Sequence, residues 1–158
     1  MIQITKPSLS DLSEIELILS QWTETIEVEK YLSRIKNEIN GIVEYHTYFW
    51  VIKNNDQTVG IGGLADPLPK TLPFASSLNP LEIKILYLDN NSRGLGLGKQ
   101  LLQFLETEAK KTNCSELLIR TSDRYKTTAW DFYQHLGYKL AGYLDNDGHQ
   151  MAVFRKIL

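Results

Sequence analysis

The feature that most constrains the fold is the segment 81–111, where a strand pattern, a glycine-rich turn and a helix pattern follow one another directly. Residues 81–88 (LEIKILYL) read as a strand, whose regular alternation places Glu82, Lys84, Leu86 and Leu88 on one face. Residues 99–111 repeat apolar side chains at helical spacing, at Leu101, Leu102, Leu105 and Ala109. A strand that passes through a tight turn into a helix is typical of α/β domains, so we predict the α/β class.

The other segments predict further strands and helices, and these strands form one sheet with the strand of this unit. Strand patterns occur at 2–6, 47–53, 58–66, 116–122, 138–144 and 149–157, and helix patterns at 11–22, 26–39 and 127–137. The proline-rich stretch 67–80 reads as a stiff loop. The order β-α-α-β-β-β-α-β-α-β-β predicts a single domain over residues 1–158, with a central mixed sheet of six or seven strands and helices on both faces.

Composition narrows the functional classes. The 158 residues are 42% hydrophobic and 23% charged, which is ordinary for a soluble globular protein. The net charge of −2 argues against a nucleic-acid partner. No apolar run is long enough to cross a membrane, and residues 1–12 lack a signal-peptide pattern, so we expect a cytoplasmic protein without a membrane partner. Cys114 is the single cysteine, which excludes an intrachain disulfide, and no metal-ligand spacing occurs.

The glycine-rich turn does not match two common nucleotide motifs. A P-loop would need glycine at Arg93 and serine or threonine at Gln100. A dinucleotide fingerprint would need its third glycine at Lys99 or Leu101. Two interpretations stay open. One is an anion site, built from the first amides of the helix with Arg93 and Lys99. The other is a plain strand-to-helix turn.

Two motifs together resemble a known family. Arg93-Gly94-Leu95-Gly96-Leu97-Gly98 matches the R/Q-x-x-G-x-G/A signature of the GNAT superfamily of acyl-CoA-dependent N-acyltransferases. The segment 128–142 (TAWDFYQHLGYKLAG) is similar to the later helix and strand of that family, and the element order also fits. The resemblance implies a splayed, bulged strand at the cofactor site. It also implies coenzyme A as cofactor, with acetyl-CoA as the co-substrate and no metal.

The resemblance assigns the cofactor contacts. The pyrophosphate would lie on the glycine turn, which comprises Arg93, Gly94, Leu95, Gly96, Leu97, Gly98 and Lys99. The backbone of Leu86, Tyr87 and Leu88 would pair with the pantetheine arm. Lys126 stands where the family often has an asparagine that bonds the pantetheine. Lysine reaches a phosphate or a carbonyl but accepts no hydrogen bond, so the contact at this position differs.

The resemblance also suggests two catalytic residues. Tyr133 would be the general acid that meets the departing thiolate, and Glu82, or a water that it orients, would take the proton of the amine. Structural alternatives remain for both residues. Tyr133 also fits a core aromatic position, and Glu82 also fits a solvated strand residue paired with Lys84.

The resemblance implies the transfer of an acetyl group from acetyl-CoA to a primary amine, by direct attack in a ternary complex. The acceptor would be a small molecule or a peptide or protein amine, and a homodimer is compatible with the family. Aromatic residues such as Trp22 and Phe74 are guesses for the acceptor site. The alternatives are a catalytically silent CoA-binding sensor of the same fold and a protein that binds a nucleotide other than CoA.

Overall fold

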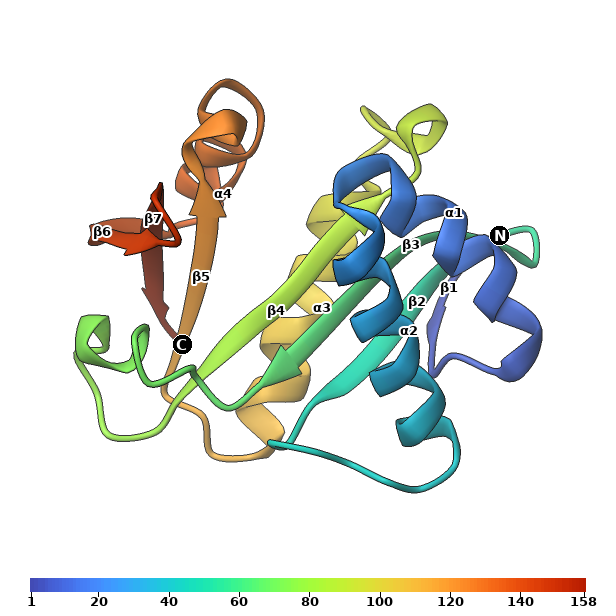
Figure 1. Ribbon diagram of the computed structural model, residues 1–158, viewed down its shortest axis with the longest axis horizontal. Helices are drawn as coiled ribbons and strands as arrows, with labels where there is room; N and C mark the ends of the chain where they lie inside the picture. Colours follow the sequence, from blue (N-terminus) through green and yellow to red (C-terminus); the bar gives the residue numbers. More distant parts are fainter. The chain divides into compact units, whose positions relative to one another are not determined.

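The structure, a computed structural model, describes all residues from 1 to 158 and consists of seven strands and four α-helices (Figure 1). The strands are β1 (Ile2–Thr5), β2 (Tyr48–Asn54), β3 (Gln57–Ala65), β4 (Pro80–Leu88), β5 (Glu116–Ser122), β6 (Lys139–Asn146) and β7 (His149–Ile157). The helices are α1 (Leu12–Trp22), α2 (Thr25–Ile39), α3 (Leu97–Lys111) and α4 (Asp131–His135). The element order is the predicted one, and the α/β class is confirmed.

The sheet is mixed, as predicted. The strand order is β1-β2-β3-β4-β5-β7-β6. Strand β4 runs parallel to β5, with Pro80 to Ile83 opposite Glu116 to Ile119, whereas β5 and β6 each run antiparallel to β7. The chain divides into two compact units, each described by itself: residues 1–65 with 84–105, and residues 66–83 with 106–158.

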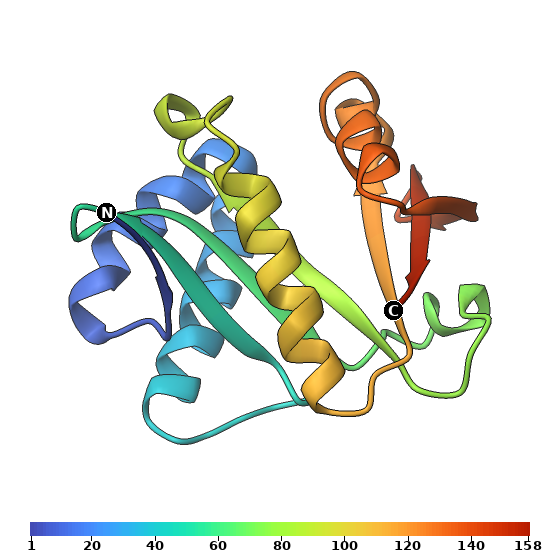
Figure 2. The same cartoon turned by 180° about the vertical axis from the view of Figure 1, so that it is seen from behind.

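In the first unit, helices lie on both faces of the strands. A buried cluster on one face joins α1 and α2 to β2, β3 and Ile85. A second cluster joins Leu97 and Leu101 of α3 to Ile52 and Val59 (Figures 1 and 2). A Cβ built on Gly62 would lie 2.9 Å from Cδ1 of Leu105, so the glycine lets α3 approach β3 closely. The predicted inward residues of α3 are fully buried, which confirms the helical pattern of that segment.

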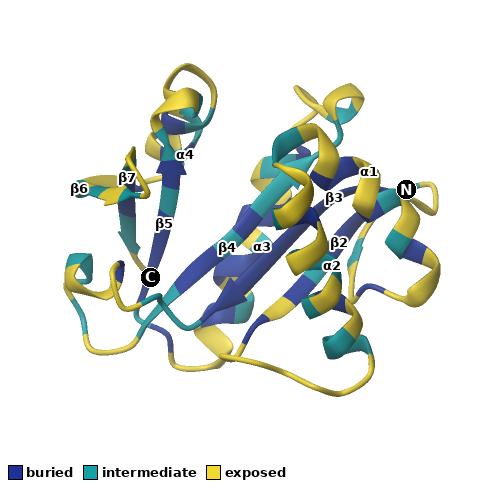
Figure 3. Ribbon diagram, viewed as in Figure 1, coloured by how far each residue is buried: buried dark blue, intermediate teal, exposed yellow.

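In the second unit, the two faces of the strands have different chemistry. Phe154 of β7 packs against Trp130 and Tyr133, so this face is aromatic. The register places Leu118 of β5 beside Glu82 of β4 and Arg155 of β7, and the other face is therefore charged. Strand β5 is almost wholly buried despite these charges (Figure 3).

Buried carboxylates attach the loop 66–79 to the charged face. Glu116, at 0% exposure, accepts hydrogen bonds from the backbone and hydroxyl groups of Ser76 and Ser77, over 2.7–3.1 Å. Near the other end of the loop, Glu82 accepts a hydrogen bond from the N–H of Leu68. Between these points, Arg155 donates to the carbonyl of Phe74 at 3.0 Å. The loop predicted to be stiff is therefore fixed by side chains of the neighbouring strands.

The helix predicted at 127–137 is divided in the structure. Residues Lys126–Trp130 form a π-helical segment, and α4 proper covers only Asp131–His135. Gly137, at φ 93°, follows the helix end as predicted. Helix α3 begins two residues before the predicted boundary, because Leu97 and Gly98 already belong to it.

Candidate functional site

The glycine turn requires its glycines for backbone conformation. Gly94 and Gly96 both have φ of 79°, a left-handed conformation that costs a residue with a side chain about 1–2 kcal/mol. No atom lies within 4 Å of a Cβ built at either position, so space is not the constraint there. Gly94 and Gly96 are therefore required by the conformation of the backbone.

The start of α3 leaves amide donors available. The N–H of Gln100 donates to the carbonyl of Gly96 at 3.2 Å, and the amides of Leu97, Gly98 and Lys99 precede this bond. Such first-turn amides have no intrahelical acceptor and lie at the positive end of the helix dipole. Arg93 and Lys99 are exposed on either side of these donors in the sequence. This arrangement suits a phosphate or a pyrophosphate.

The strand before the turn presents opposite faces to the two clusters of the first unit. Leu86 and Leu88 pack with Ile52 and Leu101, and Tyr87 packs with the other cluster. The predicted alternation of these side chains is therefore confirmed at this end of β4. The three residues are half-buried.

Trp22, which the sequence suggested only as a guess for the acceptor site, contacts the end of β4 and the glycine turn in the structure. Its ring stacks on Tyr87 with centroids 6.0 Å apart, and the guanidinium carbon of Arg93 lies 4.9 Å from the Trp22 ring. Its indole Nε1 donates to the carbonyl of Leu88 at 2.7 Å. This carbonyl, one of the groups expected to pair with pantetheine, keeps a single lone pair for a ligand. Trp22 thus connects the strand with the turn.

Gln21 holds the same turn from the neighbouring position. Its Nε2 donates to Oδ1 of Asp89 at 2.7 Å, and its Oε1 accepts from the N–H of Asn90 at 2.9 Å. The N–H of Asp89 in turn donates to the carbonyl of Val59 at 2.8 Å. No sequence motif marks Gln21, because its partners lie 68 and 69 residues further along the chain.

Tyr133 lies in the second unit, in α4. The residue is 7% exposed, and its ring contacts Phe132, Tyr138 and Phe154. Burial raises the pKa of its phenol well above the ordinary value of 10, so the hydroxyl keeps its proton at neutral pH. The tyrosine is a core aromatic by its packing and a proton-bearing donor by its chemistry, so the two interpretations from the sequence are compatible.

Glu82 is buried and paired, which corrects the solvated alternative for this residue. It is 1% exposed, and Nε of Arg120 donates to its Oε1 at 2.6 Å. Its Oε2 accepts from the N–H of Leu68 at 3.0 Å. The cation beside it is therefore Arg120 on the adjacent strand, and not the Lys84 of the solvated alternative, since burial of a carboxylate requires a charge partner and hydrogen bonds.

Lys126 is exposed at the start of the π-helical segment. Its Nζ lies 5.5 Å from the centroid of the Trp130 ring, a distance typical of a cation–π contact. The three histidines of the chain, His46, His135 and His149, are exposed, whereas the single cysteine, Cys114, is buried. Burial raises the pKa of the Cys114 thiol, which makes it a poor nucleophile.

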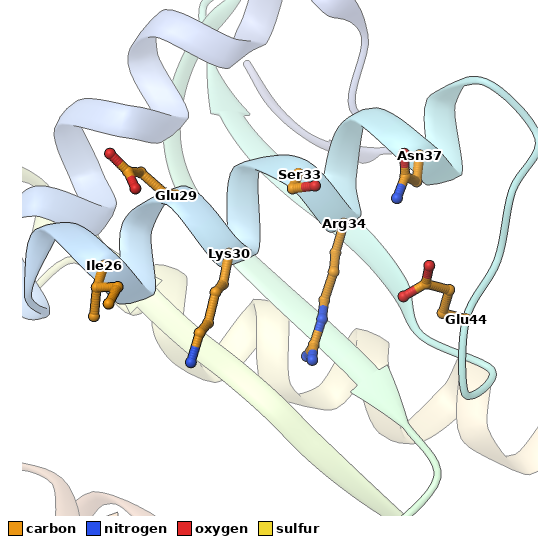
Figure 4. A pocket seen from close by; sticks show the side chains of 7 residues that line it. All are labelled: Ile26, Glu29, Lys30, Ser33, Arg34, Asn37 and Glu44. Carbon is orange, nitrogen blue, oxygen red and sulfur yellow. The ribbon is translucent and has the colours of Figure 1, made fainter.

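A hollow of about 390 Å³ lies beside α2 (Figure 4). It is lined by Ile26, Glu29, Lys30, Ser33, Arg34, Asn37 and Glu44. The side chains of Lys30 and Arg34 extend from the same side of the helix (Figure 4). Two acidic and two basic residues line the hollow, so its charge favours neither sign of ligand.

Comparison with known proteins defines the family. A family model described as acetyltransferase (GNAT) domain matches residues 45–140, which is more than half of the 158 residues. The chain belongs to this GNAT acetyltransferase family. The matched range includes Glu82, the glycine turn, Lys126 and Tyr133, whereas Gln21 and Trp22 precede it.

One curated relative and two solved structures illustrate the relationship. The chain is 27% identical to N-acetyltransferase 8B of Homo sapiens over 121 residues, which are 77% of this chain. The match covers 51% of that relative, so the chain spans about half the length of the curated protein.

Structural similarity extends over the whole chain. A putative acetyltransferase of the GNAT family from Desulfovibrio desulfuricans aligns with a TM-score of 0.80 at 14% identity and covers 99% of both chains. The PaiA N-acetyltransferase from Thermoplasma acidophilum, solved in complex with coenzyme A, aligns with a TM-score of 0.69 at 19% identity, over 100% of this chain and 99% of the other. At these identities the likeness shows the fold, and this fold is the one expected from the sequence. No helix of the chain combines the length and the apolar character that crossing a membrane requires.

Proposed function

We propose that this protein transfers the acetyl group of acetyl-CoA to a primary amine of a small molecule or a peptide. The observation that carries the proposal is the glycine turn, which lies inside the family match and has φ of 79° at both Gly94 and Gly96. Coenzyme A in the PaiA structure of the same fold supports acetyl-CoA as the donor. The amine would attack the thioester directly in a ternary complex, as expected for the family.

The residues of the turn fit a pyrophosphate. Two exposed cations, Arg93 and Lys99, flank amides that precede the first hydrogen bond of α3. Bound there, acetyl-CoA supplies the activated acyl group. Leu86, Tyr87 and Leu88 would hold the pantetheine through their backbone, while Trp22 fixes the carbonyl of Leu88. Holding the donor in one orientation lowers the entropic part of the barrier.

Tyr133 would stabilise the leaving thiolate. Because burial raises the pKa of its phenol, full proton transfer to a thiolate, whose ordinary pKa is about 8.5, is energetically uphill. A hydrogen bond from the hydroxyl to the developing charge on sulfur needs no such transfer. We therefore assign Tyr133 the role of hydrogen-bond donor to the sulfur: the C–S bond of the thioester breaks as the amide bond forms, CoA leaves as the thiolate, and this thiolate takes its proton from solvent.

Glu82 would receive the proton of the attacking amine through a water. Both of its oxygens already accept hydrogen bonds, from Arg120 and from Leu68, but each keeps a second lone pair. The carboxylate is too buried to meet the amine directly. A water between the two groups connects them without moving the strand.

The test is the release of CoA from acetyl-CoA in the presence of a panel of primary amines. Tyr133→Phe should keep binding of acetyl-CoA and lower kcat by about 10- to 1000-fold, since removal of one such donor costs about 1.5–4 kcal/mol. Tyr143→Phe, at a residue 47% exposed, serves as the matched control. Tight binding of acetyl-CoA without turnover of any amine would instead favour the silent sensor.

A further inference from the structure

Arg120 of β5 carries hydrogen-bond donors that the fold does not use. Its Nε donates to Oε1 of Glu82 at 2.6 Å, and this is the one hydrogen bond that its guanidinium makes to the chain. A guanidinium has five N–H donors in a planar fork. Four of them, on Nη1 and Nη2, are therefore available to a ligand.

The position of this guanidinium is fixed before any ligand arrives. Glu82 is 1% exposed, and its second oxygen is held by the N–H of Leu68. The Arg120 side chain is 16% exposed, so most of it is enclosed while its surface remains reachable. A cation held in this way loses little conformational entropy when it binds a further group.

Arg155, the second arginine of the same face, uses its terminal nitrogen within the fold, whereas Arg120 does not. Arg155 donates from Nη1 to the carbonyl of Phe74 and lies 3.9 Å from Glu116. Its terminal nitrogen thus serves the attachment of the loop 66–79. Arg120 lies on the same face, because residues 118 and 120 alternate together along β5, yet its terminal nitrogens attach nothing.

We propose that Arg120 binds a carboxylate on the acceptor, so that the preferred substrates are amines that also carry a carboxylate. The inference rests on the proposed acetyl transfer. The fork matches a carboxylate in two parallel hydrogen bonds, which neither a neutral carbonyl nor an ammonium group reproduces. Glu82 neutralises the guanidinium on its Nε side, and the second acid of this face, Glu116, is occupied by Ser76, Ser77 and Arg155. The Nη side therefore faces no competing carboxylate that makes a contact with it.

The experiment compares three forms of the same acceptor: an amino acid, its carboxamide and the corresponding amine without the carboxylate. The series includes acceptors in which one to five carbons separate the carboxylate from the amine, because the experiment also has to determine which separation the site prefers. The wild type should prefer one carboxylated form by about 10- to 100-fold in kcat/KM, the range for charge-assisted hydrogen bonds. Arg120→Gln should abolish this preference through KM, and Arg120→Lys should restore part of it.

Two variants separate recognition from damage to the fold. Arg120→Gln leaves the buried Glu82 without its cation, so the double variant Glu82→Gln/Arg120→Gln, which carries no buried charge, is compared with it in stability and ligand binding only, because the loss of Glu82 also removes the proposed proton acceptor. Thermal unfolding and acetyl-CoA binding report on its integrity. Arg34→Gln removes one positive charge from an arginine without a partner in the chain and should keep the preference.

The outcomes distinguish this inference from the proposed function. If the wild type acetylates neutral amines as well as carboxylated ones, or if Arg120→Gln keeps the preference, the inference fails and the acetyltransferase stands. If no amine is acetylated, the proposed function fails. Calorimetry of the carboxylated amines with the CoA-bound protein then tests the carboxylate site at Arg120 by itself. Binding that is lost in Arg120→Gln supports this site, and absence of binding to the wild type overturns it.

Discussion

The indole Nε1 of Trp22 lies 2.7 Å from the carbonyl oxygen of Leu88 and donates a hydrogen bond to it. This bond joins the last residue of α1 to the last residue of β4, across 66 positions of sequence. The same ring stacks on Tyr87 and lies beneath the guanidinium of Arg93. One side chain therefore sets both the end of the strand and the first residue of the glycine turn.

Trp22→Phe should weaken acetyl-CoA binding. Phenylalanine keeps an aromatic face for Tyr87 but loses the donor to Leu88 and weakens the contact with Arg93. We expect a rise of about 5- to 20-fold in the KM for acetyl-CoA, with a smaller change in kcat, and a loss of about 1–2 kcal/mol in stability. Tyr45→Phe, at a residue 74% exposed, is the control. An unchanged KM would mean that the turn holds its shape without Trp22.

A pair of glycines allows the strain of the turn to be separated from its function. Gly96 and Gly41 both have left-handed φ, 79° and 84°, and neither has an atom within 4 Å of a built Cβ. Alanine at either position should cost about 1 kcal/mol of stability in urea unfolding, because the backbone strain is the same. Gly96→Ala alone should also weaken acetyl-CoA binding in calorimetry. Equal weakening by Gly41→Ala would contradict a pyrophosphate site at the turn.

The loss of folding stability at acid pH should depend on Glu116. Burial opposes ionisation of this carboxyl, but hydrogen bonds from Ser76 and Ser77 outweigh it, so the pKa of Glu116 lies below its ordinary value of 4.5. A depressed folded pKa contributes stability above the unfolded value, and this contribution is lost as the pH falls below 4.5 through the folded pKa. Asp11, whose pKa is also lowered, adds a loss in the same direction.

Glu116→Gln should therefore destabilise the protein at pH 7 by about 1–3 kcal/mol, because an amide cannot accept all the hydrogen bonds of the carboxylate. Its stability should also fall less steeply than that of the wild type below pH 4.5. Denaturant unfolding at several pH values measures both effects. Glu29→Gln, at an exposed residue, provides the control. Parallel curves for the wild type and Glu116→Gln would refute the role of this carboxyl in acid sensitivity.

The sequence predicted the elements whose signals are local. Helix α3 and strand β4 followed from the spacing of their own apolar residues, and the glycine turn between them followed from three glycines in five positions. The α4 region was predicted less well, because a π-helical segment and an α-helix differ in hydrogen bonding while their apolar spacing is similar.

Contacts between segments that are distant in the sequence could not be predicted from the sequence. The sequence offered Lys84, a neighbour on the same strand face, as one possible partner of Glu82, whereas the partner in the structure, Arg120, lies 38 residues away. Strand pairing brings these two residues together, and periodicity does not reveal which strands pair. For the same reason the sequence did not single out Gln21 and did not reveal the contacts of Trp22, which join α1 to the end of β4.

The attachment of the loop 66–79 has a consequence for how the protein meets its ligands. Glu82 holds Leu68, and Glu116 holds Ser76 and Ser77, so both ends of the loop are fixed by buried carboxylates of the strands. A segment of this kind is ordered when the chain folds. A molecule that binds against the loop therefore contacts a preordered surface. Its association rate should be set by diffusion and by orientation, without a slow step in which the loop becomes ordered.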